Sequence, residues 1–239
     1  MPHGGGQTRI EWHKLGYVDR LQSDFKVITV DIPGNGESDK PTTTSSYAID
    51  KILEDILMVA DACRTSQFSV LGFSFGGNIA RYLAATSDRI KKAVIMSVPF
   101  GPAINDDAMK NVNEIIDNLR RIHQKQVDRT LDYHSLTESE RAFMKNSSPL
   151  AWIATYQAML SWGTIKPSDI LCLVMLMIGT KNTFAMPRMA DYDEEAKSAG
   201  IRLEFLEGFS HMQELTEIDK VLPIILSFLK DSSRTNNSR

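Results

Sequence analysis

Short apolar runs that alternate with segments of helical periodicity constrain the fold of this chain more than any other feature. The runs are rich in β-branched and aliphatic residues and short enough to be buried strands, and they lie at residues 25–32, 68–72, 93–98, 171–178 and 201–206. Helical spacing of apolar residues is found at 49–63, 78–86, 188–199 and 216–230. Strands that alternate with helices are typical of a mostly parallel sheet with helices on both faces, so we expect an α/β fold.

Residues 100–168 interrupt this alternation, because they contain no strand-like run and are charged and helical in character. We interpret them as a helical cap inserted into a core that is built from residues 1–99 and 169–230. The last residues, 231–239, are polar and poor in apolar side chains, so we expect a flexible tail there.

The composition excludes several classes of partner. The 239 residues carry 27 basic and 30 acidic side chains, a formal charge of −3, so the basic surface that nucleic acids require is absent. The longest apolar run, 170–178, is shorter than the ~20 residues of a membrane helix, and the first residues lack the features of a signal peptide. Cys63 and Cys172 have no metal-binding spacing. We therefore expect a cytoplasmic protein with free thiols and with neither nucleic-acid nor membrane partners.

One glycine-rich segment follows a predicted strand directly and precedes a predicted helix: Gly72-Phe73-Ser74-Phe75-Gly76-Gly77. A G-x-S-x-G pattern between a strand and a helix forms a nucleophile elbow, in which glycines two positions on either side of the serine permit a tight turn. Outside that context, the same residues would be a glycine- and serine-rich loop without chemistry. We therefore predict that Ser74 is a catalytic nucleophile.

A serine hydroxyl needs a general base, and histidine titrates in the range that this role requires. Among five histidines, His211 lies just beyond the last predicted strand and before the last predicted helix. This position brings it to the carboxyl edge of the sheet, where Ser74 also lies. We predict that His211 is the base, with an ordinary core or surface histidine as the alternative.

Four motifs in this order resemble those of the α/β-hydrolase superfamily, and the resemblance covers nearly the whole chain. His3-Gly4-Gly5-Gly6 is similar to its oxyanion loop and residues 31–38 (DIPGNGES) to its D-x-x-G-x-G-x-S turn. Ser74 and His211 match its nucleophile and its base. The resemblance implies an α/β-hydrolase fold whose helical cap is inserted after the sixth strand.

The same resemblance implies an oxyanion hole. The backbone N–H groups of Gly5 and Phe75 would stabilise the negative oxygen of a tetrahedral intermediate. A flexible leader, or the remains of a cloning linker, is the alternative interpretation of residues 3–6.

The third member of the triad departs from the family pattern. The resemblance implies an acid after the seventh strand, but Asn182 stands there. In a serine protease such an amide leaves the imidazole in the wrong tautomer, at a cost of ~10⁴ in turnover. Asp106 or Asp107, just after the sixth strand, is the candidate replacement, although both also fit as helix-capping residues that open the cap. Two glutamates flank the predicted base, and we interpret them as a strand-end and a helix-start carboxylate: Glu207 and Glu214.

The start of the chain is a second departure. Only Met1 and Pro2 precede His3, whereas the family places a central strand and two further strands before this loop. Relative to that pattern roughly 20 residues are missing, given a mean strand of ~5–6 residues. We therefore expect either a shortened gene model or isoform, or a sheet with unusual pairing.

These features predict a serine hydrolase that acts on a small ester or similarly activated acyl compound through an acyl-enzyme, with neither a metal nor an organic cofactor. Trp152, Tyr156 and Trp162 of the cap either pack it on the core or line the site, in which case the substrate is apolar. A serine nucleophile argues against epoxide hydrolase chemistry. Because of Asn182 and the missing strands, a catalytically impaired α/β-hydrolase-like binding protein is the alternative.

Overall fold

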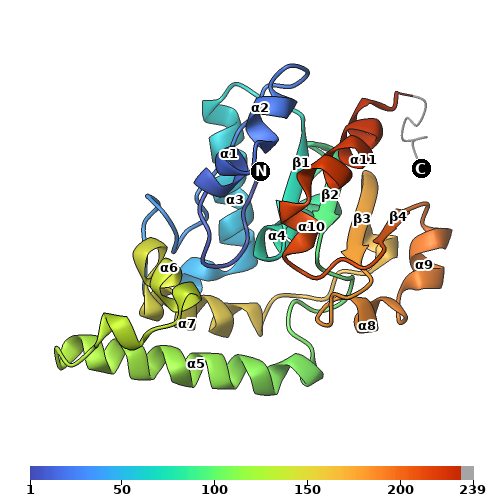
Figure 1. Cartoon of the computed structure of the whole chain (residues 1–239). Helices are drawn as coiled ribbons and strands as arrows, with labels where there is room; N and C mark the ends of the chain where they lie inside the picture. Colours follow the sequence, from blue (N-terminus) through green and yellow to red (C-terminus); the bar gives the residue numbers. More distant parts are fainter. Residues whose placement is uncertain (233–239) are drawn as a thin grey trace.

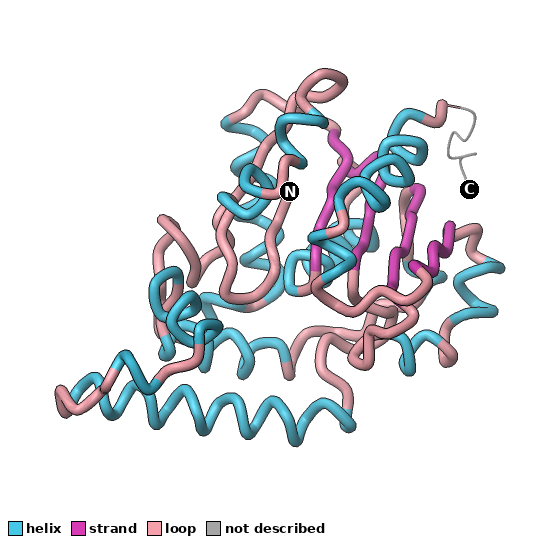
Figure 2. Tube along the Cα trace, viewed as in Figure 1, coloured by secondary structure: helices cyan, strands magenta, loops and turns pink. Residues whose placement is uncertain are grey.

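The centre of the molecule is a sheet of four parallel strands (Figure 2), in a computed structural model that describes residues 1–232. In the order in which they pair, the strands are β1 (Phe68–Phe73), β2 (Ile90–Met96), β3 (Leu173–Gly179) and β4 (Arg202–Leu206). Each overlaps one of the predicted apolar runs, and all three pairings are parallel, so the expected α/β architecture is confirmed. The tail expected at 231–239 lies, from residue 233 onward, outside the described residues.

Helices cover both faces of this sheet (Figure 1). Successive side chains of a strand point to opposite sides, so each strand contributes to an apolar core on either face. In β3, Val174, Leu176 and Ile178 pack into one apolar core, whereas Met175 and Met177 pack into the other. The first core is completed by α3 (Ile49–Ala62), α4 (Phe75–Thr86), α8 (Met186–Met189) and α9 (Asp193–Ser198). The second is completed by α1 (Ile10–Lys14), α2 (Tyr17–Leu21), α10 (Gln213–Thr216) and α11 (Ile218–Lys230). The single helix expected at 188–199 is therefore divided into α8 and α9.

Residues 100–168 are largely helical, and their helices are gathered along one side of the molecule with α5 outermost (Figure 1). The α-helices are α5 (Asp106–Val127), α6 (Glu138–Asn146) and α7 (Pro149–Met159). The Asn105 side chain caps α5 by accepting a hydrogen bond from the Ala108 N–H at 3.1 Å, and Thr137 with Glu140 forms a capping box on α6. No helix within residues 1–232 is both long and apolar enough to cross a membrane.

The strand predicted at residues 25–32 does not join the sheet, and this prediction is wrong. Within the described part of the chain, the segment makes a single parallel bridge, between Val30 and Pro2, and the Met1 ammonium group donates a hydrogen bond to the Ile28 carbonyl at 2.6 Å. A cavity of about 480 Å³ separates it from β1, lined on its two sides by apolar residues of both segments. An apolar run becomes a strand only where a neighbour accepts its backbone hydrogen bonds, and here the neighbouring place is open.

Candidate active site

Ser74 lies on the sharp turn that joins β1 to α4. Its backbone has φ +53° and ψ −113°, a conformation that L-residues rarely adopt, and its N–H donates a hydrogen bond to the Met96 carbonyl at 3.0 Å. A Cβ atom on Gly72 would lie 2.1 Å from the Gly76 carbonyl oxygen, and one on Gly76 would lie 2.2 Å from the Pro2 carbonyl oxygen. Backbone therefore passes too close for any residue but glycine at both positions, which explains the G-x-S-x-G spacing.

The loop at residues 3–6 is fixed against the elbow by its histidine. The Gly76 N–H donates a hydrogen bond to the His3 carbonyl at 2.9 Å. The His3 ring is buried, with Nδ1 2.8 Å from the Gly4 carbonyl and Nε2 accepting a hydrogen bond from the Ile32 N–H at 3.1 Å. Burial lowers the pKa of His3 to about 4, so the ring is neutral at pH 7. The interpretation of these residues as a flexible leader is therefore wrong.

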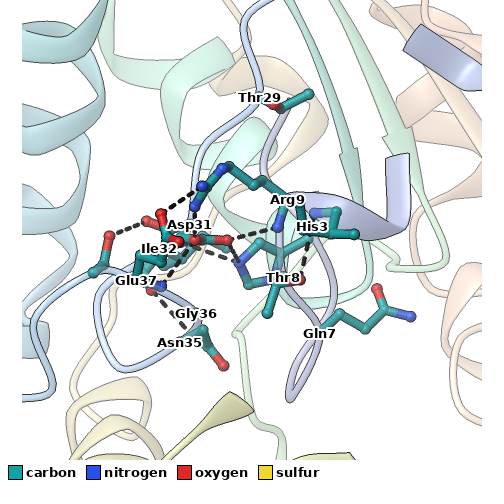
Figure 3. A network of polar contacts seen from close by, with 12 residues as sticks. His3, Gln7, Thr8, Arg9, Thr29, Asp31, Ile32, Asn35, Gly36 and Glu37 are labelled. Atoms are coloured by element: carbon teal, nitrogen blue, oxygen red, sulfur yellow. Dashed lines mark hydrogen bonds and ion pairs between the residues drawn. The ribbon is translucent and has the colours of Figure 1, made fainter. Parts of the chain in front are cut away.

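A network of charged groups braces the turn at residues 31–38 beside this loop (Figure 3). Asp31 forms an ion pair with the Arg9 guanidinium and accepts hydrogen bonds from the N–H groups of Arg9, at 2.6 Å, and Glu37, at 3.0 Å. Burial by itself would raise the pKa of Asp31, but these two N–H groups and the Arg9 charge lower it below its usual value. The D-x-x-G-x-G-x-S motif therefore lies against the loop at residues 3–6, which its Ile32 N–H holds through His3.

The backbone N–H groups of Gly5 and Phe75 are unpaired within the described residues. Phe75 directly follows Ser74, and Gly5 belongs to the loop whose His3 carbonyl accepts the hydrogen bond from the Gly76 N–H. Phe75 is the first residue of α4, where the helix leaves its N–H groups without intrahelical partners. Gly5 is exposed, and a Cβ atom on it would lie 2.8 Å from the Trp152 ring. Free N–H donors at such positions have the chemistry that an oxyanion needs.

His211 lies between β4 and α10, with Nε2 3.1 Å from Ser74 Oγ. Its ring packs against the rings of Phe73 and Phe184, at centroid distances of 5.1 and 6.4 Å. Burial lowers the pKa of His211 below its ordinary value. The imidazole is therefore neutral near pH 7 and sits within hydrogen-bond reach of the hydroxyl whose proton it would accept.

Asn182 lies beside the other nitrogen of His211, but it offers a donor where an aspartate would offer an acceptor. Its Oδ1 accepts hydrogen bonds from the N–H groups of Phe184, at 3.1 Å, and Ala185, at 3.0 Å, which fixes the amide. Its Nδ2 lies 3.2 Å from His211 Nδ1 and donates to Glu214 Oε1 at 2.7 Å. Asn182 by itself therefore favours a proton on Nε2 of the imidazole, which is the wrong tautomer for accepting one from Ser74.

Asp106 and Asp107 do not replace the missing acid at the position that the structure gives them. Both side chains are exposed in the first turn of α5. Burial lowers the pKa of Arg188, and the nearby charge of Asp107 partly opposes that shift. Within residues 1–232, the side-chain partners of His211 Nδ1 are Ser97 and Asn182. The interpretation of these aspartates as triad acid is wrong. The helix-capping interpretation misses by one residue, because the Asn105 side chain caps α5 and both aspartates lie in its first turn, where the helix dipole favours acidic groups.

Two residues that sequence reasoning did not assign complete the surroundings of His211. Ser97, directly after β2, has its Oγ 3.1 Å from His211 Nδ1 and donates a hydrogen bond to Glu214 Oε2. Glu214, in α10, is fully buried and accepts a second hydrogen bond from the Gly179 N–H at 2.9 Å. Burial raises the pKa of Glu214, and its hydrogen bonds oppose that rise. The position of Glu214 three residues after the base was the signal available in the sequence.

A cleft of about 810 Å³ opens between the oxyanion loop and the helices of residues 100–168. Of the three aromatic residues considered for its wall, Tyr156 lines it. Trp152 and Trp162 are instead buried, and their Nε1 groups donate hydrogen bonds to Asn35 Oδ1 at 3.2 Å and to the Tyr47 carbonyl at 3.1 Å. These two tryptophans pack the core, because each indole finds its polar partner there.

Comparisons with known proteins agree with this geometry. A family model described as alpha/beta hydrolase fold matches residues 1–161. Epoxide hydrolase 4 of Mus musculus is 22% identical over 263 residues, which cover 97% of this chain and 72% of that protein. Epoxide hydrolase 3 of Xenopus tropicalis is 20% identical over 254 residues, covering 92% of this chain and 68% of that protein.

Solved structures show the same fold at low sequence identity. An esterase from Exiguobacterium antarcticum has a TM-score of 0.75 at 22% identity and covers 97% of this chain and 91% of its own. A hydrolase from Pseudomonas aeruginosa PA01 has a TM-score of 0.74 at 20% identity, with coverages of 96% and 88%. Since the matched family model spans the oxyanion loop, the braced turn, the elbow and most of the helical insertion, this chain belongs to the α/β-hydrolase fold family.

Proposed function

We propose that this protein is a serine hydrolase that cleaves a small ester or a similarly activated acyl compound through an acyl-enzyme on Ser74. The observation that carries the proposal is the 3.1 Å contact between Ser74 Oγ and His211 Nε2, at a serine whose backbone is held in the elbow conformation. A nucleophile and a base at this separation are the minimum that acyl transfer requires.

The reaction would proceed in two stages. Ser74 Oγ attacks the carbonyl carbon while His211 Nε2 accepts the hydroxyl proton, and the N–H groups of Gly5 and Phe75 stabilise the oxyanion. His211 then returns the proton to the leaving alkoxide as the C–O bond breaks, which leaves an ester on Ser74. A water molecule, deprotonated by His211, attacks this ester and releases the acid and the free serine.

The cleft reaches Gly5 and Met212, the residue after His211, although neither Ser74 nor His211 itself lines it. Its walls favour a neutral or cationic acyl compound. Its lining includes the apolar or aromatic side chains of Leu119, Ile122 and Tyr156, together with carboxylates: Glu11, Glu114 and Glu140. Anionic substrates would enter against these charges, whereas an apolar acyl group would gain from the hydrophobic wall.

The chemistry of Ser74 distinguishes ester cleavage from the epoxide opening that the names of two sequence relatives suggest. A carboxylate that opens an epoxide forms an ester, which water can cleave. A serine that opened an epoxide would form an ether, which an adjacent base and water do not cleave. Ester hydrolysis is therefore the reaction that position 74 supports, and an esterase is among the proteins that share this fold.

Binding without turnover is the second candidate function, and the amide of Asn182 is the observation that favours it. Donation from Asn182 toward His211 Nδ1 would disable the base if nothing opposed it. Under this candidate, a small acyl compound would stabilise the protein and remain intact.

Labelling by a fluorophosphonate probe, together with hydrolysis of 4-nitrophenyl acetate and butyrate, separates the two candidates. We expect the wild-type protein to be labelled and to hydrolyse at least one ester, and we expect Ser74→Ala to do neither while unfolding at the same temperature. A folded wild-type protein that is neither labelled nor active would contradict the hydrolase. Thermal stabilisation by an uncleaved ester would then support the binding function.

A further inference from the structure

A closed polar network lies behind His211, on the side away from Ser74. Its members come from three segments that meet at the carboxyl edge of the sheet: Ser97 after β2, Asn182 after β3, and Glu214 in α10. Ser97, Asn182 and Glu214 are each buried, with at most 1% of their surface exposed. Because solvent does not reach these groups, their hydrogen bonds to one another decide where each proton lies.

The orientation of Glu214 is fixed on one oxygen by two N–H donors. Its Oε1 accepts hydrogen bonds from the Gly179 N–H at 2.9 Å and from Asn182 Nδ2 at 2.7 Å. The Asn182 amide cannot turn around to offer its oxygen, because that oxygen already accepts two backbone hydrogen bonds. The remaining carboxylate oxygen, Oε2, is left for the hydroxyl group of Ser97.

Ser97 has one hydroxyl proton, and where it goes determines what His211 can do. When the proton is donated to the ionised Glu214, the oxygen of Ser97 accepts a hydrogen bond from His211 Nδ1–H at 3.1 Å. The proton of the imidazole is then on Nδ1, and Nε2 is free to accept one from Ser74. Without an acceptor at Glu214, the Ser97 proton would turn to Nδ1 or to the His211 carbonyl, 3.4 Å from its oxygen, and donation from Asn182 toward Nδ1 would favour the opposite tautomer.

We propose that Glu214 acts through Ser97 as the positioning carboxylate for His211, in place of the aspartate that Asn182 lacks. The inference rests on the proposed serine hydrolase function. Glu214 touches neither the substrate nor the reacting atoms, so it is a positioning residue. Ser97 is the intermediary, and the hydrogen bonds that Glu214 accepts from Ser97, Asn182 and the Gly179 N–H oppose the effect of its burial.

The backbone of Ser97 supports this assignment independently. Its φ is +70°, in the left-handed region that a non-glycine residue adopts only under strain. Serine keeps this conformation at the end of β2, where its hydroxyl reaches both His211 and Glu214. Glycine would relieve the strain but would remove the hydroxyl.

The network also explains why position 182 is an amide. An aspartate at this position would place a second carboxylate at the 2.7 Å distance that now separates Asn182 Nδ2 from Glu214 Oε1. Two carboxylates so close in a buried site cannot both be ionised. Asn182 and Glu214 therefore form a matched pair, in which one residue carries the charge and the other donates to it.

The test compares variants of the full chain in three measurements. These are kcat for 4-nitrophenyl ester hydrolysis, fluorophosphonate labelling, and the ¹⁵N chemical shifts that report the tautomer of His211. We expect Glu214→Gln and Ser97→Ala each to lower kcat by roughly 10²–10⁴-fold, within the loss known for an amide in place of a triad carboxylate. We also expect the imidazole proton to move from Nδ1 to Nε2 in Glu214→Gln. Glu207→Gln changes an exposed carboxylate that precedes His211 in the sequence. It is the matched control and should leave kcat unchanged.

The charge swap is the decisive variant. Asn182→Asp alone should lower kcat, because it creates a carboxylate pair, whereas Asn182→Asp combined with Glu214→Gln should recover activity to within about 10-fold of wild type. Recovered activity in this double variant would also show that a chain with glutamine at position 214 can fold. Activity of Glu214→Gln and Ser97→Ala within threefold of wild type, with Ser74→Ala inactive, would overturn the positioning role and leave the hydrolase standing. If the wild-type protein cleaved no ester, an Nδ1–H tautomer that is lost in Glu214→Gln would support the role, and an unchanged tautomer would overturn it.

Discussion

Two histidines lie near the turn at Ser74, His3 buried and His211 half-buried, and the difference between them lies in what their ring nitrogens face. His3 uses both nitrogens on backbone groups, the Gly4 carbonyl and the Ile32 N–H. His211 faces a side-chain hydroxyl on each side, that of Ser74 on Nε2 and that of Ser97 on Nδ1. Burial lowers the pKa of both rings, so the shift alone does not identify the base. Partners that can exchange a proton identify it.

Substitution of the two histidines should separate their roles most clearly, with the largest effect on kcat at His211. We expect His211→Gln to lower kcat by about 10⁴-fold or more, because it removes the group that accepts the Ser74 proton, while the unfolding temperature stays close to wild type. Ester hydrolysis and thermal denaturation measure the two effects. His123→Gln, in α5, is the matched control and should change neither, and an active His211→Gln would exclude this residue as the base.

His3→Ala should have the opposite profile, with its main effect on stability. The substitution leaves the Ile32 N–H without a buried partner, leaves the Gly4 carbonyl with the Gln7 N–H alone, and removes a packed ring, so we expect the free energy of unfolding to fall by about 2–4 kcal/mol. Urea denaturation measures this loss. His3→Gln, whose amide can reach one of the two partners, should lose less, and equal losses would contradict the role of the ring hydrogen bonds.

The pH dependence of stability should sharpen the contrast further. The pKa of His3 is about 4 in the folded protein, below its ordinary value of 6.5. Between these two pH values the unfolded chain binds a proton at His3 and the folded chain does not, so acidification lowers the free energy of unfolding there. Between pH 7.5 and 4.5, we expect wild type to lose about 2–3 kcal/mol more than His3→Gln. Urea denaturation at both pH values checks this, and parallel losses in the two proteins would contradict it. The Met1 ammonium, whose pKa burial lowers to about 5, adds a loss of the same sign to both proteins.

The smallest effect concerns the open place between residues 25–30 and β1. An apolar strand such as VVLL, fused ahead of Met1, would enter the cavity of about 480 Å³ and extend the pairing that begins at Pro2 and Val30. We expect a gain of about 1–2 kcal/mol in the free energy of unfolding, since the apolar surface buried exceeds the cost of ordering a short segment. A Gly-Ser extension of equal length is the control, and an equal gain with it would show that the cavity is not filled.

Local signals in the sequence predicted the elements that local sterics decide. The strands β1 to β4 follow from continuous apolar runs, and the turn at Ser74 follows from two glycines where backbone approaches within 2.1–2.2 Å of a would-be Cβ atom. The run at 25–32 is similar in composition but meets only Met1 and Pro2, so it forms one bridge at Val30 and no strand. The sequence left open whether Trp162 packs on the core or lines the site, because its Nε1 partner, the Tyr47 carbonyl, is 115 residues away in the chain.

The sequence by itself determined the turn that carries Ser74 and indicated Ser74 and His211 as the nucleophile and base that we propose, because a short motif marks the first and the place after the last strand marks the second. Only the tertiary structure decided which side chains lie at Nδ1 of His211, and how they connect it to Glu214. Ser97 and Glu214 are 117 residues apart, and neither lies in a recognisable motif. Their charge and proton positions depend on burial and on donors from three segments, and these arise only when the sheet and its helices are assembled.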